Sequence, residues 1–390
     1  MSSFEGPNSV GGDLAIQDRD LGSTFRFTEI DRALDPWFAF KRQLNEDHGL
    51  QIQFGYQTLA QAASEGLGED FAAGGLAEFL GSWTLFGRGT DNPGALYFRV
   101  EDRHRLGTAV SPANLGYEFG SIMQTGSTFS EFNVALTEFS WRQTIFDGRA
   151  QISVGKLSGT SWYNNHPLSS PKRGFQNQAF ITSSSKPIVD RGLGAVAGFQ
   201  LTDEIQLIGG IHDANAFAAW NPFDTIDEGE FFHSLEIRWN PSSNNKVGTL
   251  LRQLRVQAWH QDARVDAGFP EANGVTFAAG RLSDDKVMPF VMGGVSDGDA
   301  SFLKADLTAG VGYGFESNGV IARDVLGAAM GWGDPSVPGL RDQYSSELFF
   351  RFQLSHNLAV TPSAQLIVNP ASNPYHDAVL VLGLRGRLTF

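Results

Sequence analysis

The chain has 390 residues and no cysteine, and its 43 acidic residues outnumber its 29 basic ones. The missing cysteine excludes a disulfide scaffold, a thiolate zinc site and a cysteine nucleophile, and a net charge of −14 disfavours a nucleic-acid partner, which needs a basic face. Apolar residues make up 41% of the chain without any run of about 18, as a spanning helix requires. With 45 glycines and 31 phenylalanines along its length, the chain is expected to be all-β.

The first 49 residues are expected to form a segment of their own. They contain no basic region followed by an apolar stretch, so no signal peptide is recognised, and the chain is either cytosolic or a mature form. Residues 36–49 have the features of a short helix, with Asp35 as a cap, Pro36 in the first turn and Gly49 at the end. We therefore expect residues 1–49 to be an N-terminal segment with one short helix, and residues 50–390 to be a separate unit.

From residue 50 onward, apolar and polar residues alternate in stretches of about ten residues. In one stretch, Leu96, Phe98 and Val100 alternate with polar residues that include Arg99 and Glu101. Soluble sandwiches and transmembrane barrels both show such alternation. Charges in the middle of the polar faces favour the barrel, because a sandwich core cannot accept unpaired charge. The predicted strands are 50–60, 74–86, 94–105, 132–146, 149–157, 192–201, 205–213, 230–240, 250–262, 274–283, 287–296, 303–316, 323–332, 343–356, 358–368 and 378–390.

The number of predicted strands and the lengths of their connections indicate one kind of barrel. Sixteen is an even number within the range of single-chain bacterial barrels, and it leaves an aqueous channel. Connections are short near residues 146–149 and 201–204 but long at 106–131 and 158–191. Short turns at a periplasmic rim and long loops at the other rim are typical of such barrels. The sequence predicts a transmembrane antiparallel β-barrel of about sixteen strands.

The connection at residues 158–191 is longer than a loop needs to be if it only joins two strands, so we expect it to have a function. It contains Trp162, Phe175 and several basic residues. Such a loop either folds into the barrel and narrows it, or lies exposed on the surface, and its residues alone leave both possibilities open.

The last predicted strand alternates up to the terminal Phe390. A final strand that ends on an aromatic residue is similar to the last strand of bacterial outer-membrane barrels. An ordinary amphipathic strand would show the same pattern, so this strand alone does not distinguish an outer-membrane barrel from a soluble protein.

Several segments together resemble one family, the carbohydrate-selective outer-membrane porins of OprB type. The sequences LTEFSWRQ at 136–143 and ISVGK at 152–156 are similar to the central hairpin of that family, and TPSAQLIVNP at 361–370 is similar to one of its last strands. The resemblance runs from about residue 36 to residue 390. Its start departs from the family pattern, since the usual glycine- and tryptophan-rich opening is weak here.

The resemblance implies a passive diffusion channel of the bacterial outer membrane that is selective for small carbohydrates such as glucose. It implies that residues 1–49 are a periplasmic segment, that outer-membrane lipid surrounds the barrel, and that the barrel assembly machinery recognises Phe390. Many porins are trimers, whereas channels of this family can work as monomers, so both states stay open. The resemblance implies neither a cofactor nor an enzymatic activity.

The alternation places both arginine and glutamate on the inner face of the barrel. Arginine has five hydrogen-bond donors for sugar hydroxyls, and mixed arginine and glutamate favours a neutral polyol over an anion. The alternative for each residue is an Arg–Glu pair that only stiffens the wall. We expect the narrow zone to be lined by five wall residues and by one of two aromatic residues of the long loop: Arg99, Glu138, Arg238, Arg255 and Arg385, with Trp162 or Phe175.

Other functions are less well supported by the residues. The eight histidines lack HxxxH and HExxH spacings, so neither a metal site nor an enzyme is predicted. The sequence at 297–301 alternates oxygen ligands but lacks the glycine and terminal glutamate of a calcium loop. The remaining alternatives are a porin for an organic acid or amino acid, a plugged-barrel enzyme or surface-binding protein, and a soluble all-β protein.

Overall fold

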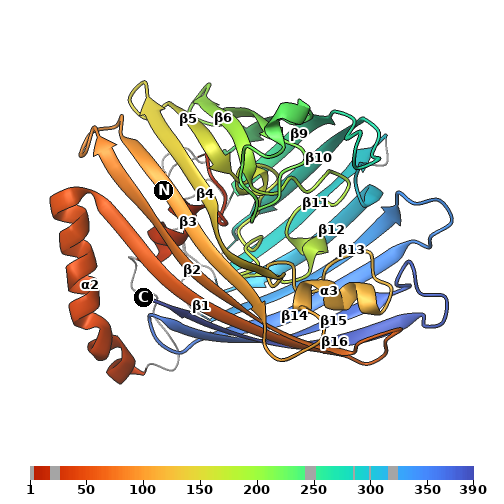
Figure 1. The fold of residues 1–390 in the computed structure, drawn as a ribbon. Helices are drawn as coiled ribbons and strands as arrows, with labels where there is room; N and C mark the ends of the chain where they lie inside the picture. Colours follow the sequence, from red (N-terminus) through yellow and green to blue (C-terminus); the bar gives the residue numbers. More distant parts are fainter. Residues whose placement is uncertain (1–3, 18–26, 242–251, 284–285, 298–299, 315–323) are drawn as a thin grey trace.

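The computed structural model is a closed antiparallel β-barrel (Figure 1). It describes residues 4–17, 27–241, 252–283, 286–297, 300–314 and 324–390. The described residues form sixteen strands in which each pairs with its neighbours in sequence, and β1 pairs with β16 to close the barrel. This confirms the predicted fold class. The strands are β1 (Leu50–Ala63), β2 (Phe71–Phe86), β3 (Gly94–Arg105), β4 (Phe132–Ile145), β5 (Ala150–Leu157), β6 (Gly192–Gln200), β7 (Ile205–Asp213), β8 (Phe231–Trp239), β9 (Arg252–Gln261), β10 (Ala272–Arg281), β11 (Val287–Ser296), β12 (Leu303–Tyr313), β13 (Val325–Pro335), β14 (Gln343–Gln353), β15 (Leu358–Val368) and β16 (Ala378–Thr389).

The predicted strands agree with the observed ones to within a few residues, and the first hairpin shows why some ends differ. The β1–β2 pairing continues beyond the predicted ends, with Ala62 opposite Phe71. A glycine pair in β2 is a turn signal in sequence, but here it lies within the sheet. A Cβ on Gly75 would lie 2.4 Å from Nε2 of His104 and 2.7 Å from the hydroxyl of Tyr56, so these two side chains fill the space that a larger residue would need. Some predicted strand ends lie outside the described residues: 250–251, 315–316 and 323.

The two faces of the barrel have the polarity expected from the alternation. On β3, the inward-facing Arg99 and Glu101 are buried, with 1% and 0% of their surface exposed. On β16, Leu382 and Leu384 are 55% and 54% exposed on the outer face, whereas Arg385, the next residue after Leu384, faces inward and is buried. Soluble proteins rarely bury charged side chains completely, and they rarely expose a continuous apolar surface. This barrel instead has an apolar exterior and a polar interior, which is the arrangement of a transmembrane barrel.

The C-terminal residue takes part in the seam that closes the barrel. Phe390 and Phe54 exchange two main-chain hydrogen bonds, at 2.7 and 2.9 Å between N and O. Their rings are stacked with centroids 6.1 Å apart. Pairing in β1 and β16 then continues from Gly55 opposite Thr389. The terminal aromatic residue therefore completes the hydrogen bonding of the first strand.

The helix before the first strand is longer than predicted. The helix α2 (Thr28–His48) begins eight residues before Pro36, although an interior proline removes a helical hydrogen bond. Contacts with the β14–β15 turn stabilise this first part, since Asp31 accepts a hydrogen bond from the main chain of His356 at 3.0 Å. The predicted start at residues 35–36 is therefore wrong, because tertiary contacts outweigh the proline. Gly49 does end the helix, with a left-handed φ of 70°.

The helix α2 lies outside the barrel wall, beside the first strand (Figure 1). The Trp37 ring packs against Phe54 of β1 at 6.0 Å between centroids, and the indole of Trp83 donates to the carbonyl of His48. Within the described residues, no helix combines the length and the apolar character needed to cross a membrane.

The remaining helical segments were not predicted from the sequence. In the N-terminal segment, α1 (Val10–Gln17) precedes α2, so the described part of this segment has two helices instead of the single one expected. The helix α3 (Pro112–Glu118) lies in the β3–β4 connection. Both are short, and α1 contains two glycines, which weaken the helical signal. The described connections also contain three single turns of 3-10 helix: Gly159–Ser161, Gln178–Phe180 and Ile226–Glu228.

Candidate pore constriction

The long β5–β6 connection, residues 158–191, crosses the interior of the barrel. We call it the inner loop. On β14, the carboxylate of Glu347 accepts hydrogen bonds from the main chain of Gln176 and Asn177, at 3.0 and 2.9 Å. On β16, the guanidinium of Arg385 donates to the carbonyls of Pro171 and Gly174. Because these strands lie across the barrel from the loop's own β5 and β6, the loop spans the lumen.

An apolar cluster holds the middle of the inner loop against the far wall. Phe175 is fully buried and packs edge-on against Phe349 of β14, with centroids 5.0 Å apart. It also contacts Phe180 of the same loop at 5.4 Å and Phe290 of β11 at 5.8 Å. The ring of His166 stacks on Phe290 at 4.0 Å, and burial lowers the pKa of His166 to about 4. This histidine is therefore neutral at physiological pH and part of the apolar anchor.

Polar contacts fix both flanks of the inner loop. On its first flank, Glu236 of β8 accepts a hydrogen bond from the main chain of Asn164 at 2.7 Å. The same carboxylate contacts Arg238 at 2.5 Å and Arg255 at 3.5 Å. On its second flank, Asp306 of β12 accepts one hydrogen bond from the hydroxyl of Ser183 and another from the main chain of Ser185, at 2.5 and 3.0 Å. The loop is thus tied to the wall on both sides of its apolar cluster.

The β3–β4 connection, residues 106–131, also folds inward and supports the inner loop. Its Gln124 carbonyl accepts a hydrogen bond from the main chain of Gln178 at 3.0 Å, and Ser127 donates to the carbonyl of Gln176 at 3.2 Å. Gln343 of β14 in turn donates to Ser121 at 3.0 Å. Two inward-folded connections therefore narrow the lumen together.

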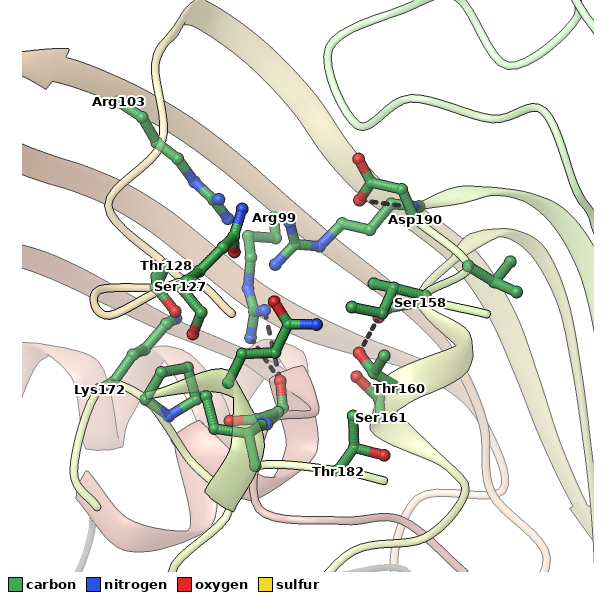
Figure 2. Close-up of a pocket in the computed structure, with 18 residues that line it drawn as sticks. Arg99, Arg103, Ser127, Thr128, Ser158, Thr160, Ser161, Lys172, Thr182 and Asp190 are labelled. Atoms are coloured by element: carbon green, nitrogen blue, oxygen red, sulfur yellow. Dashed lines mark hydrogen bonds between the residues drawn. The ribbon is translucent and has the colours of Figure 1, made fainter. Parts of the chain in front are cut away.

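A cavity of about 170 Å³ lies beside these connections. One water needs only about 10–15 Å³ measured in this way, so the cavity has room for a small solute. Figure 2 shows Arg99, Arg103 and Lys172 around this space, together with five hydroxyl side chains: Ser127, Thr128, Ser158, Thr160 and Ser161. Ile181 and Ile188 add apolar surface to its lining. The cavity thus offers charged donors, hydroxyl groups and apolar patches.

Alternating cations and carboxylates form a chain of ion pairs along one side of the cavity. Glu101 lies between Arg103 and Arg191, at 2.9 and 3.2 Å from their guanidinium nitrogens. Glu138 lies between Arg191 and Arg99, at 3.7 and 3.3 Å. We call the set the ion-pair chain, and its members are, in order of contact, Arg103, Glu101, Arg191, Glu138, Arg99, Asp13, Lys172 and Glu78.

The ion-pair chain holds as many carboxylates as cations. Asp13 contacts Arg99 at 2.8 Å and Lys172 at 3.3 Å, and it also pairs with Arg173. Burial disfavours the charged form of Asp13, but Lys172, Arg173 and Arg99 together hold its pKa below the ordinary value. The carboxylate therefore stays ionised at neutral pH. Charges are nearly balanced along this side of the cavity.

The predicted site residues fall into two groups. Arg99 lines the cavity, and Glu138 lies next to it in the ion-pair chain. The structure places the others away from the cavity lining. Three wall arginines contact the inner loop or support it from behind, and both aromatic residues are buried against the wall: Arg238, Arg255, Arg385, Trp162 and Phe175.

Several residues of the cavity were not among the predicted site residues. Arg103 has the inward parity of Arg99 and could have been found from that signal. Lys172 and Arg191 belong to the basic residues of the inner loop, but nothing local indicates which of them faces the cavity. Asp13 carries no sequence signal at all, since its partners are more than eighty residues away.

No metal site accompanies these residues. Across the described ranges, histidine, aspartate and glutamate side chains do not gather in threes that could hold a metal ion. Of the loop considered for calcium, residues 298–299 lie outside the described residues.

A comparison with known protein families identifies a family with this architecture. The model of a family described as "Carbohydrate-selective porin, OprB family" matches residues 87–301 and 304–390. No curated protein sequence matches the chain.

Solved structures of porins have the same fold. A high-pH structure of Pseudomonas putida OprB superposes with a TM-score of 0.72 at 16% sequence identity, covering 91% of this chain and 97% of that chain. A low-pH structure of the same protein gives a TM-score of 0.51 at 14% identity with the same coverage. A mutant of Rh. blastica porin gives 0.53 at 12% identity, covering 87% of this chain and 100% of that chain. At these identities the likeness concerns the fold alone.

Proposed function

The chain belongs to the OprB family of carbohydrate-selective porins, and we propose that its cavity is the narrow zone through which small neutral carbohydrates such as glucose diffuse. Membership makes the protein an outer-membrane channel and not an enzyme. The proposal concerns the place of selection, the residues that carry it and the size and charge of the solute.

The balance of the ion-pair chain is the observation that carries this proposal. A channel for a polyol must exchange hydrogen bonds with hydroxyls yet bind weakly enough for release. Arg99, Arg103 and Lys172 offer donors that cannot accept, while the hydroxyls of Thr160 and Ser161 offer both roles. Because each of these cations already has a carboxylate partner, an anionic solute gains little here over a neutral one.

Apolar surface in the cavity supports a carbohydrate over a smaller polar solute. Ile181 and Ile188 lie in the same lining as the charged groups. A sugar ring presents hydroxyls at its edge and C–H groups on its faces, so it can meet both kinds of surface. The aromatic residues predicted for this contact, Trp162 and Phe175, are buried elsewhere, and isoleucines are proposed in their place.

Conductance in planar bilayers tests this function. The purified protein is expected to give discrete ionic steps that decrease as glucose is added, because sugar in the narrow zone displaces ions. Liposome swelling gives a second measurement, with glucose expected to enter faster than gluconate, an organic acid of similar size. Unchanged conductance in glucose, or faster entry of gluconate, would contradict the proposal and favour a porin for organic acids.

We also propose that the barrel assembly machinery recognises the C-terminal strand through Phe390. Support comes from its position, since Phe390 lies against Phe54 in the β1–β16 seam that closes the barrel. Deletion of Phe390 is expected to lower the amount of folded barrel in outer membranes several-fold. The control is the same deletion refolded in detergent without the machinery, where folding should be close to wild type. Equal loss in both settings would indicate a stability defect instead of lost recognition.

A further inference from the structure

Residues 4–17 lie inside the barrel, against the inner loop and the walls of β2, β3 and β4. The main chain of Gly6 donates to the carbonyl of Ser161 at 2.7 Å, and Arg173 donates to the carbonyl of Pro7 at 2.6 Å. Arg99 donates to the carbonyl of Asn8 at 3.3 Å. Figure 1 places this start of the chain within the ring of strands. We call residues 4–17 the inner segment.

Apolar contacts hold both ends of the inner segment. Phe4 is buried in a cluster with Trp162 and Tyr163 of the inner loop. Val10 and Leu14 of α1 pack against Leu80 of β2. These contacts do not involve the charge of the segment, so removing a single carboxylate leaves its position supported.

The inner segment supplies one carboxylate to the ion-pair chain. Every other member comes from β2, β3, β4 or the inner loop, whereas Asp13 comes from α1. Asp13 contacts three cations, Arg99, Lys172 and Arg173. Arg99 also pairs with Glu138 and Lys172 with Glu78, whereas Asp13 is the one ion-pair partner of Arg173 among the described residues. Glu5, from the same segment, neutralises Arg142 of β4. The segment itself precedes residue 87, where the family match begins.

We propose that the inner segment is a built-in selectivity element and that Asp13 is the counter-ion which keeps the narrow zone from selecting anions. Without its carboxylate, Arg173 would lose its ion-pair partner, and Arg99 and Lys172 would each keep one of two, which leaves an excess of positive charge beside the cavity. Such an excess attracts small anions such as chloride or phosphate, since two charges about 4 Å apart interact appreciably even in water. This inference rests on the proposed function of the cavity as the conduction path. It adds that a carboxylate of the inner segment keeps the charge of that path balanced.

The reversal potential of single channels in a KCl gradient tests the role of Asp13. Asp13→Asn keeps the shape of the side chain and is expected to raise the chloride-to-potassium permeability ratio about fivefold, the effect of one charge at about 4 Å in water. Inorganic phosphate should then block the variant more strongly than the wild type. Asp35→Asn, on the exposed side of α2, is the matched control and should leave the ratio unchanged.

A single cysteine tests the position of the segment, and the substitution itself leaves every ion pair in place. The chain has no cysteine of its own, so Asn8→Cys at the cavity lining can be modified alone. A cationic thiosulfonate reagent added to the open channel is expected to lower its current by at least about half and to shift selectivity toward anions. Ala39→Cys on the exposed face of α2 is the control and should show no change.

The outcomes separate this inference from the proposed function. If the wild type conducts and glucose lowers its current, but Asp13→Asn keeps the wild-type reversal potential, the inference is overturned and the function stands. If the reagent leaves the current of the Asn8→Cys channel unchanged, the inference is also overturned. A wild type without conductance would instead remove the proposed function.

Discussion

Replacing Phe175 with alanine is expected to release the inner loop from the wall while the barrel stays closed. Phe175 fills the centre of the cluster with Phe180, Phe290 and Phe349. Truncation of a buried phenylalanine to alanine costs about 3–5 kcal/mol, and here the loss falls on the docking of the loop. The variant should therefore conduct larger and less steady currents and discriminate sugars less.

Limited trypsin digestion measures the release directly. Lys172, Arg173 and Lys186 are buried in the folded loop, so cleavage after them should become faster in Phe175→Ala. Phe175→Leu keeps most of the apolar contact, so its cleavage rate should be close to that of the wild type. Phe223→Ala, at a phenylalanine that is 67% exposed, is the matched control. Wild-type currents and wild-type protease resistance in Phe175→Ala would show that the cluster does not anchor the loop.

Replacing Glu236 with alanine is the second change with a large expected effect. Arg238 and Arg255 are opposite each other in the register of β8 and β9, and the carboxylate of Glu236 contacts both. Removing one partner of a buried ion pair costs about 3–5 kcal/mol, because the remaining charge is left uncompensated. Here two adjacent arginines lose their shared anion, and the main chain of Asn164 loses its acceptor.

Urea unfolding of the barrel in lipid vesicles measures this loss. Glu236→Ala is expected to unfold at a clearly lower urea concentration than the wild type. Glu236→Gln keeps an acceptor for Asn164 but not the charge. Its unfolding midpoint should therefore lie between those of Glu236→Ala and the wild type. Asp203→Ala, in the exposed β6–β7 turn, should unfold like the wild type. If Glu236→Ala unfolds at the wild-type concentration, the two arginines do not depend on this carboxylate.

Strand positions and wall polarity could be predicted because they depend on a local pattern. Alternation with a period of two places residues on one face or the other without knowledge of their neighbours. Arg99 and Arg385 were both assigned to the inner face in this way, and both are buried there. Parity cannot say how deep in the barrel a residue lies, nor what covers it. Arg99 reaches the cavity, whereas Arg385 is covered by the inner loop.

The roles of the loop aromatic residues could not be predicted for a related reason. A loop sequence does not reveal which of its side chains face the wall and which face the solvent. Either Trp162 or Phe175 was expected to line the narrow zone, but each is buried in a cluster that fixes the loop. Asp13 shows the same limit more strongly, since its role depends on Arg99 and Lys172, which only the folded barrel brings near it.

The closure of β1 against β16 constrains how copies of this protein can meet. A sheet edge offers free main-chain groups to a strand of another molecule, but the described strands form a continuous ring in which each has two neighbours. Any contact between copies within the membrane must therefore use outward side chains such as Leu382, packed laterally and in competition with lipid. Association of this kind depends on the shape of the apolar surface and on bilayer composition, and it can be tuned without disturbing the channel.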